Sequence, residues 1–583
     1  MRSSPGPERV SGSLDHHCDF LVIGSGGGGM TAALRAHDSG LDTLVIEASD
    51  KFGGSTGMSG GALWIPNNQH MAAAGVSDSP AEGLEYLRKV AGERGTDPRV
   101  RAYVEHSPEM VRYLEGASAV KLSPCKAYCD YYPEYAGGKP GARTIEPVPY
   151  SASELGEHAR ELRRSGQGLV LGRMGVTAVE AHRLVQFSFI SYVLLFWLLV
   201  RYWLDLPARL KGKEDNRLTL GTALVGRMRR SMLDRDIPLW LSTRALELIV
   251  QDGRVVGARV ERDGKPLRIL AQHGVLLASG GFERNLDMRL HYQQHPITAT
   301  WTAGNPHNVG DGIRMGEAVG GSLDLMDEAW WTPVTLLPNE YAWLLVVEKS
   351  MPGAIMVNQA GRRFTNEAAP YGDVVHGIYA ANRPEASTVP AYLIFDARYR
   401  RSYPVGPLGP SKLQPDSAVG RRLRRDFLHK ANSLAELAAR IGVNPEGLER
   451  TVERFNTFAR VGRDEDFRRG ESAYDRYYSD AKIAPNSSLA PLVEAPFYAI
   501  AVYPGDLGTK GGLRTDIHAR VLTADDKVIA GLYAAGNCTA SVMGTSYPGA
   551  GGTIGPAMTF GYLAAMHAAA AAKSAHAHTA AAE

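Results

Sequence analysis

The chain has 583 residues, of which 44% are hydrophobic and 22% are charged, so it is long enough for two packed domains and too apolar for a disordered protein. Its formal net charge of +2 excludes the strongly basic surface typical of nucleic-acid binding, and we expect no nucleic-acid partner. The four cysteines form no CxxC pair and no metal-ligand spacing, so we expect neither a metal site nor a disulfide framework.

The N-terminal part of the chain has the pattern of a dinucleotide-binding unit. Residues 1–18 lack the apolar core of a secretory signal, and we expect a disordered leader. An apolar strand over 19–23 runs into the motif GSGGGG, a helix pattern follows, and a second strand over 42–46 ends at Glu47. Strand, glycine turn, helix, strand and acid in this order predict a βαβ unit that binds a dinucleotide.

Three glycines of the motif, which form the pattern GxGxxG, each have a physical role. Gly24 permits the tight turn, Gly26 lets the backbone approach a pyrophosphate, and Gly29 lets the helix pack closely on the strand. The helix N-terminus offers free N–H groups to the phosphates, and Glu47 can accept hydrogen bonds from ribose hydroxyls. A Gly/Ser/Thr-rich loop over 51–61 adds donors that suit the longer chain of FAD better than NAD. We therefore predict FAD, bound non-covalently because no secure attachment residue is visible.

A segment of 17 residues without a charge, LVQFSFISYVLLFWLLV, lies between Arg183 and Arg201. As a helix it would measure about 26 Å, at the short limit for a bilayer span. Its interleaved aromatic residues and the basic residues that follow favour a segment that dips into a membrane surface. A buried helix or an oligomer contact is the alternative, and a true span is disfavoured because the flanking halves belong to one domain. We expect an apolar insertion over about 184–212, with a peripheral membrane contact through 184–204.

The later part of the chain returns to the nucleotide-binding sheet. Strands ending in glycine turns are expected over 274–282 and 530–537, and the stretch between them contains a mixed α/β insert over 332–507. A helix beginning near Gly555 has Pro556 in its first turn and could direct its dipole at a bound flavin. Residues 568–583 are rich in Ala with scattered His, and we expect a disordered tail.

Five segments resemble the fumarate reductase/succinate dehydrogenase flavoprotein superfamily and extend from residue 19 to residue 562: VIGSGGGG, VIEASDKFGGSTGMSGG, VLLASGGFERN, GDLGTKGG and GLYAAGNCTASVMGTSYPGAGGTIGPAMTFG. The resemblance implies an α/β fold in which a split Rossmann-type FAD-binding domain carries an inserted α+β catalytic capping domain. We expect residues 19–331 and 508–567 to form the FAD-binding domain and residues 332–507 to form the capping domain. The residues expected to contact FAD are Gly24, Ser25, Gly26, Gly27, Gly28, Gly29, Glu47, Ala48, Gly54, Ser55, Thr56, Ser59, Gly60, Gly61, Ala245, Gly280, Gly536, Asn537, Gly552, Thr553 and Ile554.

Within this superfamily, the chain is most similar to 3-ketosteroid Δ1-dehydrogenases. The run YPGAG at 547–551 matches a steroid-dehydrogenase signature, whereas GTKGG at 508–512 lacks the His–Thr pair expected of fumarate reductases. The resemblance implies that the Tyr547 hydroxyl and the Gly551 N–H hold the 3-keto oxygen of a steroid. It further implies that Tyr371, in the run NEAAPY, is the catalytic base and that a tyrosine of the run DYYPE supports it. We choose Tyr131 over Tyr132 for this supporting role.

The function implied is FAD-dependent dehydrogenation of 3-ketosteroids, a step of steroid degradation that introduces a double bond between carbons 1 and 2. Removing a proton next to a ketone requires donors for the developing oxyanion and a base. Tyr371 would take the proton from carbon 2, and hydride from carbon 1 would pass to flavin N5.

Other functions and several partners stay open. A 3-ketosteroid 4-dehydrogenase and a fumarate-reductase-like enzyme are the alternatives, while the tyrosines argue against a non-enzymatic, membrane-associated flavin-binding protein. We expect a 3-ketosteroid substrate, a quinone or redox protein as electron acceptor, and a cytoplasmic location at the inner face of the cell membrane. The preferred steroid and the oligomeric state are not predicted.

Overall fold

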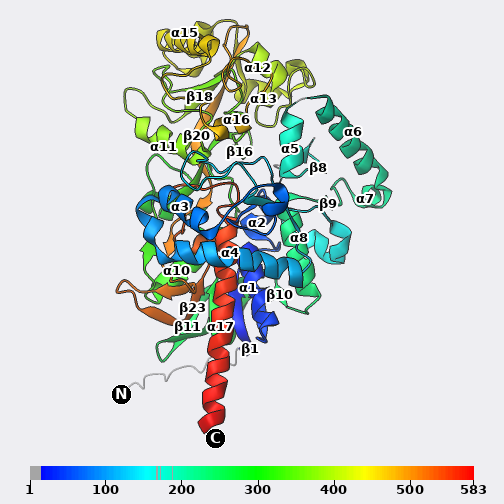
Figure 1. The fold of residues 1–583 in the computed structure, drawn as a ribbon, viewed down its shortest axis with the longest axis vertical. Helices are drawn as coiled ribbons and strands as arrows, with labels where there is room; N and C mark the ends of the chain where they lie inside the picture. Colours follow the sequence, from blue (N-terminus) through cyan, green and yellow to red (C-terminus); the bar gives the residue numbers. More distant parts are fainter. Residues whose placement is uncertain (1–14, 166–168, 171, 187, 583) are drawn as a thin grey trace, which may run out of the picture.

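The computed structural model describes residues 15–165, 169–170, 172–186 and 188–582. Most of the expected leader, Phe187 of the expected apolar insertion and Glu583 of the expected tail lie outside the described residues. The chain forms two domains stacked along the long axis, with the capping domain at the top of Figure 1 and the larger, mainly N-terminal domain beneath it.

The lower domain is organised around a sheet that is eight-stranded in the described part of the chain. Its strands are β1 (Asp15–Ile23), β2 (Thr43–Ile46), β10 (Leu239–Trp240), β11 (Thr243–Gln251), β12 (Arg254–Arg262), β13 (Lys265–Leu277), β22 (Arg520–Leu522) and β23 (Val528–Ala534). The order is β10-β2-β1-β13-β12-β23-β22, with β11 paired to β12. β1 pairs in parallel with β2 and β13, and β13 pairs in parallel with β23. Because β23 follows the capping domain in sequence, the domain is split as expected.

Two helices bring their N-termini to the same end of this sheet. In α1 (Gly27–Asp38), a Cβ on Gly28 would lie 2.7 Å from the carbonyl oxygen of Ala557 in α17 (Ile554–Ala582). One turn further along α17, a Cβ on Gly561 would lie 2.3 Å from the Gly28 carbonyl oxygen. The backbones therefore touch where larger side chains would separate them, and both positive helix ends face the same region.

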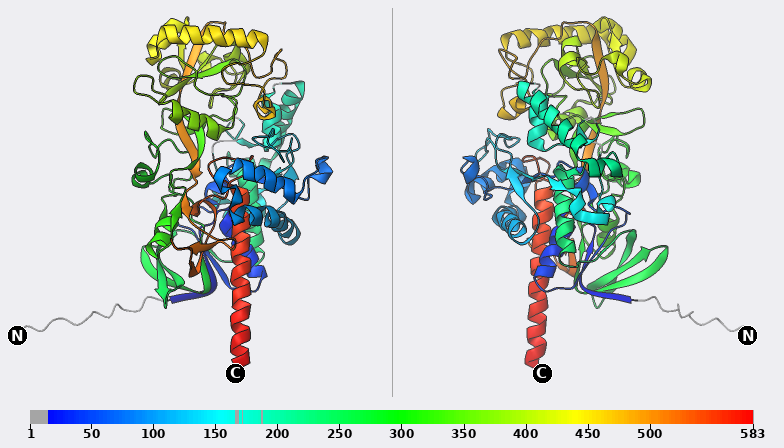
Figure 2. Two further views of the ribbon diagram at one scale, coloured as in Figure 1. Left: turned by 60° about the vertical axis from the view of Figure 1, so that its left-hand side comes forward. Right: turned by 90° about the vertical axis from the view of Figure 1, so that its right-hand side faces the viewer.

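The expected ends of the ordered chain differ from the structure. β1 begins at Asp15, because residues 15–18 pair with 268–271 of β13 and so belong to the sheet and not to the leader. α17 continues through Ala582, so the segment expected to be a disordered tail is helical that far, and it extends beyond the body of the protein in Figure 2. Ala is the strongest helix former, and Ala568 and Ala569 are buried, which explains why the helix does not end at His567.

The remaining helices and short strands of the lower domain surround the sheet. A small antiparallel sheet of order β3-β5-β4 lies against the loop that immediately precedes α17. The helices and strands around the main sheet include α2 (Gly54–Met58), α3 (Pro80–Val90), α4 (Pro98–Ala117), α8 (Leu220–Leu233), α9 (Leu286–Tyr292), α10 (Asp311–Ala318), β3 (Leu63–Trp64), β4 (Leu122–Pro124) and β5 (Thr144–Pro147).

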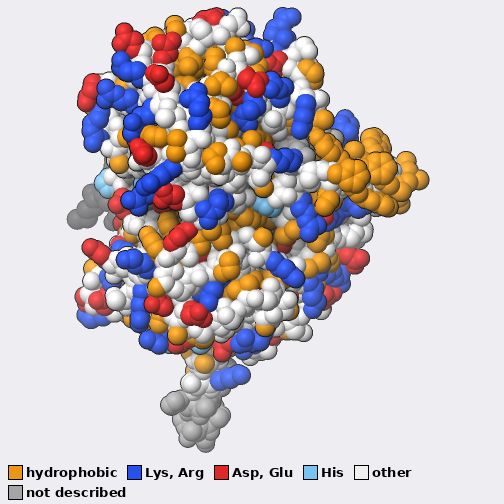
Figure 3. Space-filling model, turned by 45° about the horizontal axis from the view of Figure 1, so that its top comes forward, with side chains coloured by type: hydrophobic (Ala, Val, Ile, Leu, Met, Phe, Trp, Pro, Cys, Tyr) orange, Lys and Arg blue, Asp and Glu red, His pale blue; other side chains and the backbone are white. Residues whose placement is uncertain are grey.

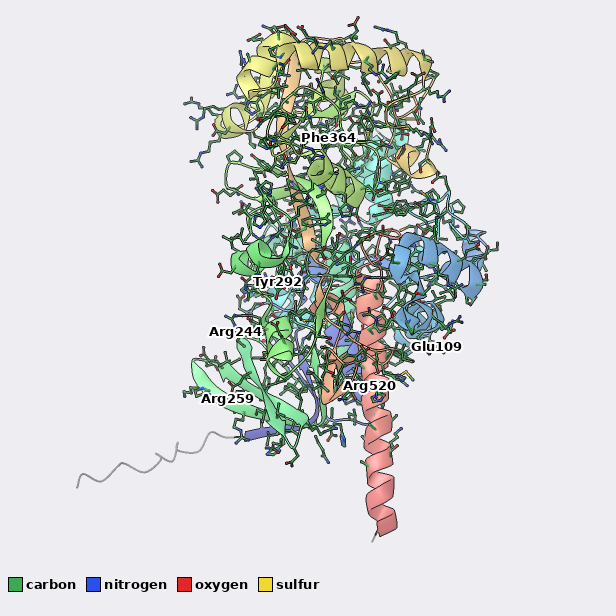
Figure 4. All side chains as sticks on the ribbon, turned by 90° about the vertical axis from the view of Figure 1, so that its left-hand side faces the viewer. Glu109, Arg244, Arg259, Tyr292, Phe364 and Arg520 are labelled. Atoms are coloured by element: carbon green, nitrogen blue, oxygen red, sulfur yellow. The ribbon has the colours of Figure 1, made fainter. Side chains whose placement is uncertain are left out.

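The capping domain contains an antiparallel sheet of order β16-β15-β20-β18-β17, to which β19 is added beside β20. Figure 4 places Phe364 in this upper domain and Arg244 and Arg259 on the β11–β12 hairpin of the lower domain. The strands are β15 (Ala329–Leu336), β16 (Ala342–Leu344), β17 (Ala354–Val357), β18 (Ala391–Phe395), β19 (His429–Ala431) and β20 (Phe497–Thr509). The helices are α11 (Tyr371–Ala381), α12 (Ala397–Ser402), α13 (Arg421–Asp426), α14 (Leu434–Ile441), α15 (Pro445–Val461) and α16 (Ala473–Tyr477). Because β15 and β20 extend across the expected domain limits at 332 and 507, these two strands carry the chain between the domains.

The apolar insertion forms helices outside both sheets, which are α5 (Ala178–Val185), α6 (Phe189–Leu204) and α7 (Leu206–Lys211). Ser188 caps α6 in a capping box with Ser191, so a new helix starts inside the charge-free segment. α6 buries Leu198 and Tyr202 in a small cluster with residues of β8 (Met174–Gly175) and its neighbours.

Most apolar side chains of α6 face outward. Phe189, Phe196 and Trp197 are 81%, 62% and 63% exposed. Figure 3 shows hydrophobic side chains projecting from the side of the molecule on which Figure 1 places α6. Within the described ranges, no helix combines the length and the hydropathy needed to traverse a bilayer.

Candidate active site

A large cavity with a volume of about 480 Å³ is lined by both domains. Its lining has two chemically different parts. One part is rich in Gly, Ser and Thr and comes from the turn after β1, the loop around α2 and the N-termini of α1 and α17. The other part is apolar and aromatic and includes side chains from the capping domain and from α5.

The glycine-rich part has the donors and the space that a dinucleotide needs. Gly26 caps α1 without a side chain, and the Gly27 N–H donates to the Thr56 hydroxyl at 3.0 Å, while Gly26, Gly27 and Gly28 all line the cavity at the positive end of the helix. Among the described residues beyond its chain neighbours, a Cβ built on Gly26 would have one close contact, the Thr56 hydroxyl at 3.8 Å. The backbone there is therefore open to a ligand. Gly24 has φ +114°, and a Cβ there would lie 2.4 Å from the Ala278 carbonyl oxygen. The residues present therefore fit the phosphates of FAD.

Glu47 is held at the edge of this region by the turn itself. Its carboxylate accepts hydrogen bonds from the Ser25 N–H at 3.1 Å and the Ser25 hydroxyl at 2.6 Å, and from the Ser49 N–H at 3.1 Å. The Ser25 hydroxyl accepts in turn from the Gly53 N–H at 3.0 Å. This fixed carboxylate lines the cavity, and its role toward a ribose stays a prediction.

Nearly all of the residues expected to contact FAD line this cavity. Those that do are Gly24, Ser25, Gly26, Gly27, Gly28, Glu47, Ala48, Gly54, Ser55, Thr56, Ser59, Gly60, Gly61, Ala245, Gly280, Gly536, Asn537, Thr553 and Ile554. Gly29 does not, because it faces the strand: a Cβ there would lie 2.1 Å from the Gly24 carbonyl oxygen. Gly552 does not either, because it packs against the side chains of Tyr547 and Pro548.

Three tyrosines from distant parts of the chain meet in the aromatic part of the cavity. The hydroxyls of Tyr131 and Tyr371 lie 2.7 Å apart, and the ring of Tyr547 lies 5.3 Å from that of Tyr131 and 5.4 Å from that of Tyr371. The Tyr547 hydroxyl forms a 2.9 Å hydrogen bond with the Thr553 hydroxyl. All three tyrosines and Gly551 line the cavity. The residues expected to be catalytic are therefore brought together.

Burial and the shared hydrogen bond act in opposite directions on Tyr371. Burial raises the pKa of Tyr371 well above its ordinary value, whereas the hydrogen bond from Tyr131 lowers it. Burial likewise raises the pKa of Tyr547, and the hydroxyl of Thr553 opposes this rise. Both phenols are therefore neutral at physiological pH, so Tyr547 is available as a hydrogen-bond donor.

Tyr132 points elsewhere. Its hydroxyl donates a 2.8 Å hydrogen bond to Asp373, two residues after Tyr371 on α11, and it does not line the cavity. Tyr131, which was preferred from the sequence, is the one whose hydroxyl reaches Tyr371.

The loop that carries Tyr131 is hydrogen-bonded to the loop that carries Tyr547. The Tyr131 N–H and the Tyr86 hydroxyl both donate to the Pro548 carbonyl oxygen, at 3.0 Å and 2.7 Å. Gly551 has φ +101°, and a Cβ on it would lie 2.5 Å from the backbone of Leu63 and Trp64 in β3. Glycine is required there because the turn needs a positive φ and because β3 leaves no room for a side chain. The Gly551 N–H makes no hydrogen bond within the described part of the chain.

An aromatic wall extends outward from the three tyrosines, and the sequence alone does not predict it. Tyr128 lies 6.3 Å from Tyr131 between ring centres and stacks on Tyr477 at 4.3 Å, and Tyr477 stacks on His182 of α5 at 4.2 Å. The available signal was the pair Tyr477-Tyr478, which resembles the pair at 131–132 in composition. α5, at the start of the apolar insertion, thus forms part of the cavity wall.

Few charges face the aromatic part. Arg244 also lines the cavity, but it lies on β11 at the dinucleotide end and forms an ion pair with Asp311 at 2.9 Å. Burial lowers the pKa of His182 below its ordinary value, so its ring is neutral at physiological pH. Among the described cavity residues, no Lys or Arg lies beside the tyrosines. The arrangement suits an uncharged, rigid, apolar ligand with one hydrogen-bond acceptor.

Comparison with known proteins gives a consistent result. The family model described as an FAD binding domain matches residues 19–554. The chain is 43% identical over 560 residues to 3-oxosteroid 1-dehydrogenase of Mycolicibacterium smegmatis, covering 94% of this chain and 96% of that protein. It is 36% identical over 568 residues to 4-oxocyclohexanecarboxylate 2-dehydrogenase of Sinomonas cyclohexanicum, covering 94% and 92%. Among solved structures, 3-ketosteroid Δ1-dehydrogenase from Sterolibacterium denitrificans in complex with 1,4-androstadiene-3,17-dione is 44% identical with a TM-score of 0.93, covering 95% of this chain and all of that chain.

Proposed function

Because this chain belongs to the family of FAD-dependent 3-oxosteroid 1-dehydrogenases, we propose that it removes hydrogen from carbons 1 and 2 of 3-ketosteroids. The observation that carries the proposal is the meeting of Tyr131, Tyr371 and Tyr547 in an uncharged cavity that continues into the dinucleotide region. FAD, held by the turn after β1 and the N-termini of α1 and α17, would supply the two-electron oxidant that takes up the hydride from carbon 1.

Tyr547 and Gly551 would form a clamp for the 3-keto oxygen. If the Thr553 hydroxyl donates to Tyr547, the Tyr547 proton is free to donate to the ketone. The Gly551 N–H, which has no hydrogen-bond partner among the described residues, supplies a second donor from the same loop. Two donors aimed at an oxygen that gains negative charge lower the barrier by about 3 kcal/mol each.

Tyr371 would remove the proton from carbon 2. A phenol with a raised pKa is a weak base, so its ionisation must be assisted at the moment of transfer. Tyr131 supplies this assistance by hydrogen bonding to the Tyr371 oxygen, which stabilises the phenolate. The hydrogen bonds of the ketone clamp to the 3-keto oxygen make the same carbon-2 proton more acidic, so both effects favour breaking the bond between carbon 2 and this proton.

The alternatives fit this cavity less well. A fumarate-type reductase must hold two carboxylates, and the described residues that line the cavity at the tyrosines include no cation that could hold them. The same argument disfavours a ring ketone that carries a carboxylate, such as the substrate in the name of the Sinomonas relative. A 3-ketosteroid 4-dehydrogenase would use a ketone clamp of the same kind but needs its base beside another carbon.

The decisive experiment is anaerobic reduction of the purified holoenzyme by a panel of ring ketones, with product analysis. We expect androst-4-ene-3,17-dione to bleach the flavin and to yield the 1,4-diene. Bleaching only by succinate, added for comparison, or only by 4-oxocyclohexanecarboxylate would overturn the steroid proposal. Conversion of a 5α-saturated 3-ketone to the 4-ene would assign the 4-dehydrogenase reaction instead.

We also propose that the exposed face of α6 binds the surface of a lipid bilayer from the cytoplasmic side. This face combines Trp197 and Trp203 with large aliphatic side chains, and the basic residues Arg209 and Lys213 follow it. A peripheral contact would bring the entrance of an apolar cavity close to lipid-dissolved steroids. It would also bring the reduced enzyme close to a quinone or a membrane-bound redox protein as the electron acceptor.

A further inference from the structure

Lys510 is a buried cation that the reaction described above does not use. It follows β20 directly and is only 2% exposed. Its Nζ donates a 2.6 Å hydrogen bond to the Ser546 carbonyl oxygen and lies 4.5 Å from the centre of the Trp330 ring. It forms no ion pair with any carboxylate of the described residues. Burying an ammonium group without a counter-ion is costly, so its position calls for a compensating role.

Both contacts of Lys510 lead to Tyr547. The Ser546 carbonyl belongs to the peptide bond that joins Ser546 to Tyr547. The Trp330 ring packs edge-on against the Tyr547 ring at 4.7 Å, and its Nε1 donates to the Asn537 amide oxygen at 3.1 Å. Lys510 therefore holds Tyr547 from the backbone side and, through Trp330, from the ring side.

The acidic groups near Lys510 already have partners. The Glu328 carboxylate accepts from Trp331 Nε1 at 2.9 Å and lies 3.4 Å from His376, and the Asp373 carboxylate accepts from the Tyr132 hydroxyl. Burial lowers the pKa of Lys510 to about 7, while these two carboxylates oppose the change. The charge on Lys510 is therefore present below neutral pH and is lost above it.

We propose that Lys510 is a positioning residue for the ketone clamp and that it holds the Tyr547 hydroxyl in place through Ser546 and Trp330. This inference rests on the proposed steroid dehydrogenation, because the clamp has no task without a ketone. The carbonyl contact fixes the start of the YPGAG loop, and the cation–π contact fixes the indole against which Tyr547 packs.

The test combines flavin reduction with infrared spectroscopy of the 3-keto group in bound 1,4-androstadiene-3,17-dione. In Lys510→Met, we expect the reduction rate at saturating steroid to fall about tenfold, since a displaced clamp donor loses part of its 10²–10³-fold effect. The carbonyl stretch should move up toward its value in an apolar solvent, while FAD content and steroid Kd change little. Lys510→Arg should recover part of both signals, because Arg keeps the charge and the donor. Lys121→Met is the matched control, because the exposed Lys121 Nζ also donates to a backbone carbonyl, that of Glu115 at 2.7 Å.

A second measurement starts from the wild-type protein. In the wild-type complex, raising the pH from 6 to 8.5 removes the proton from Lys510, so the carbonyl stretch should rise across this range, whereas in Lys510→Arg it should stay constant. A wild-type enzyme that oxidises steroids, with neither the rate nor the carbonyl stretch altered in Lys510→Met, would overturn the inference and leave the proposed function intact. A wild-type enzyme that oxidises no steroid would overturn the proposed function itself.

Discussion

The phenolic oxygens of Tyr131 and Tyr371 lie 2.7 Å apart, although 240 residues separate the two in sequence. Tyr131 belongs to a loop of the FAD-binding domain, and Tyr371 is the first residue of α11 in the capping domain. The hydrogen bond that assists the proposed base therefore exists only when both domains are in place.

Replacing Tyr371 by Phe removes the proposed base and keeps the ring. We expect flavin reduction by androst-4-ene-3,17-dione to slow by at least about 10²-fold, the usual contribution of a positioned base. FAD should stay bound, because Tyr371 lies in the aromatic part of the cavity. Stopped-flow absorbance measures the rate, and Tyr192→Phe, on the exposed face of α6, serves as the control. Near-normal reduction in Tyr371→Phe would remove this residue as the base.

Replacing Tyr131 by Phe removes the hydrogen bond that lowers the pKa of Tyr371. The pKa of Tyr371 should then rise, and a base must lose its proton to act, so the ascending limb of the pH–rate profile should move to higher pH. Tyr132→Phe is the matched control, because its hydroxyl binds Asp373 and not Tyr371. An equal displacement of the limb in both variants would contradict the assignment of Tyr131.

Gly551→Ala should disturb the ketone clamp through the backbone. The new Cβ would lie 2.5 Å from the β3 backbone at a φ of +101°, so the loop that carries Tyr547 must shift. We expect a loss of about 1–3 kcal/mol in the free energy of unfolding, typical of overpacking, together with slower turnover. Gly40→Ala is the control for backbone strain, because Gly40 has φ +96° with no atom within 4 Å of its Cβ. Similar losses in the two variants would show that strain, and not contact with β3, limits position 551.

Glu367→Gln tests the support beneath the Tyr371 loop. The Glu367 carboxylate is fully buried, accepts bidentate hydrogen bonds from Arg363 at 2.8 Å and lies 3.1 Å from Arg469. Although burial raises the pKa of Glu367, the charge of Arg363 outweighs it and holds the pKa at about 2. Breaking such a pair leaves an uncompensated buried charge, and we expect the variant to lose about 3–5 kcal/mol at pH 7 in guanidinium unfolding.

The same carboxylate predicts how stability depends on pH. Because its pKa is about 4.3 in an unfolded chain and about 2 when folded, its contribution is complete above pH 4.3 and is lost as the pH falls toward 2. The difference between wild type and Glu367→Gln should therefore shrink over this interval. A difference that is constant from pH 7 to pH 3 would contradict the depressed pKa.

Replacing Phe189, Phe196 and Trp197 by Ser tests the membrane proposal. These side chains are exposed and do not line the cavity, so activity toward dissolved steroid should be unchanged while sedimentation with anionic lipid vesicles decreases strongly. Replacing Leu413, Val461 and Val493 by Ser provides the control, because they are exposed apolar residues of the capping domain. Undiminished binding to vesicles in the first variant would exclude α6 as the contact.

Local pattern was sufficient for the dinucleotide-binding half of this protein. The turn at Gly24, the open backbone at Gly26 and the carboxylate of Glu47 are neighbours in sequence and in space, so strand and helix periodicity with a glycine motif predicts their positions. The same reasoning is wrong at the tail, where the run of Ala predicts a disordered end although buried contacts continue the helix.

Other features depended on the packing of the two domains. Two adjacent tyrosines at 131 and 132 have the same local pattern, and only the position of α11 makes one of them meet Tyr371 and the other meet Asp373. The ring contacts from Tyr128 to His182 and the contacts of Lys510 could not be derived from the sequence for the same reason, although the pair Tyr477-Tyr478 and the run GTKGG are visible in it. A hydrogen bond or a ring contact depends on distances of a few ångströms between segments hundreds of residues apart, and those distances exist only after the chain has folded.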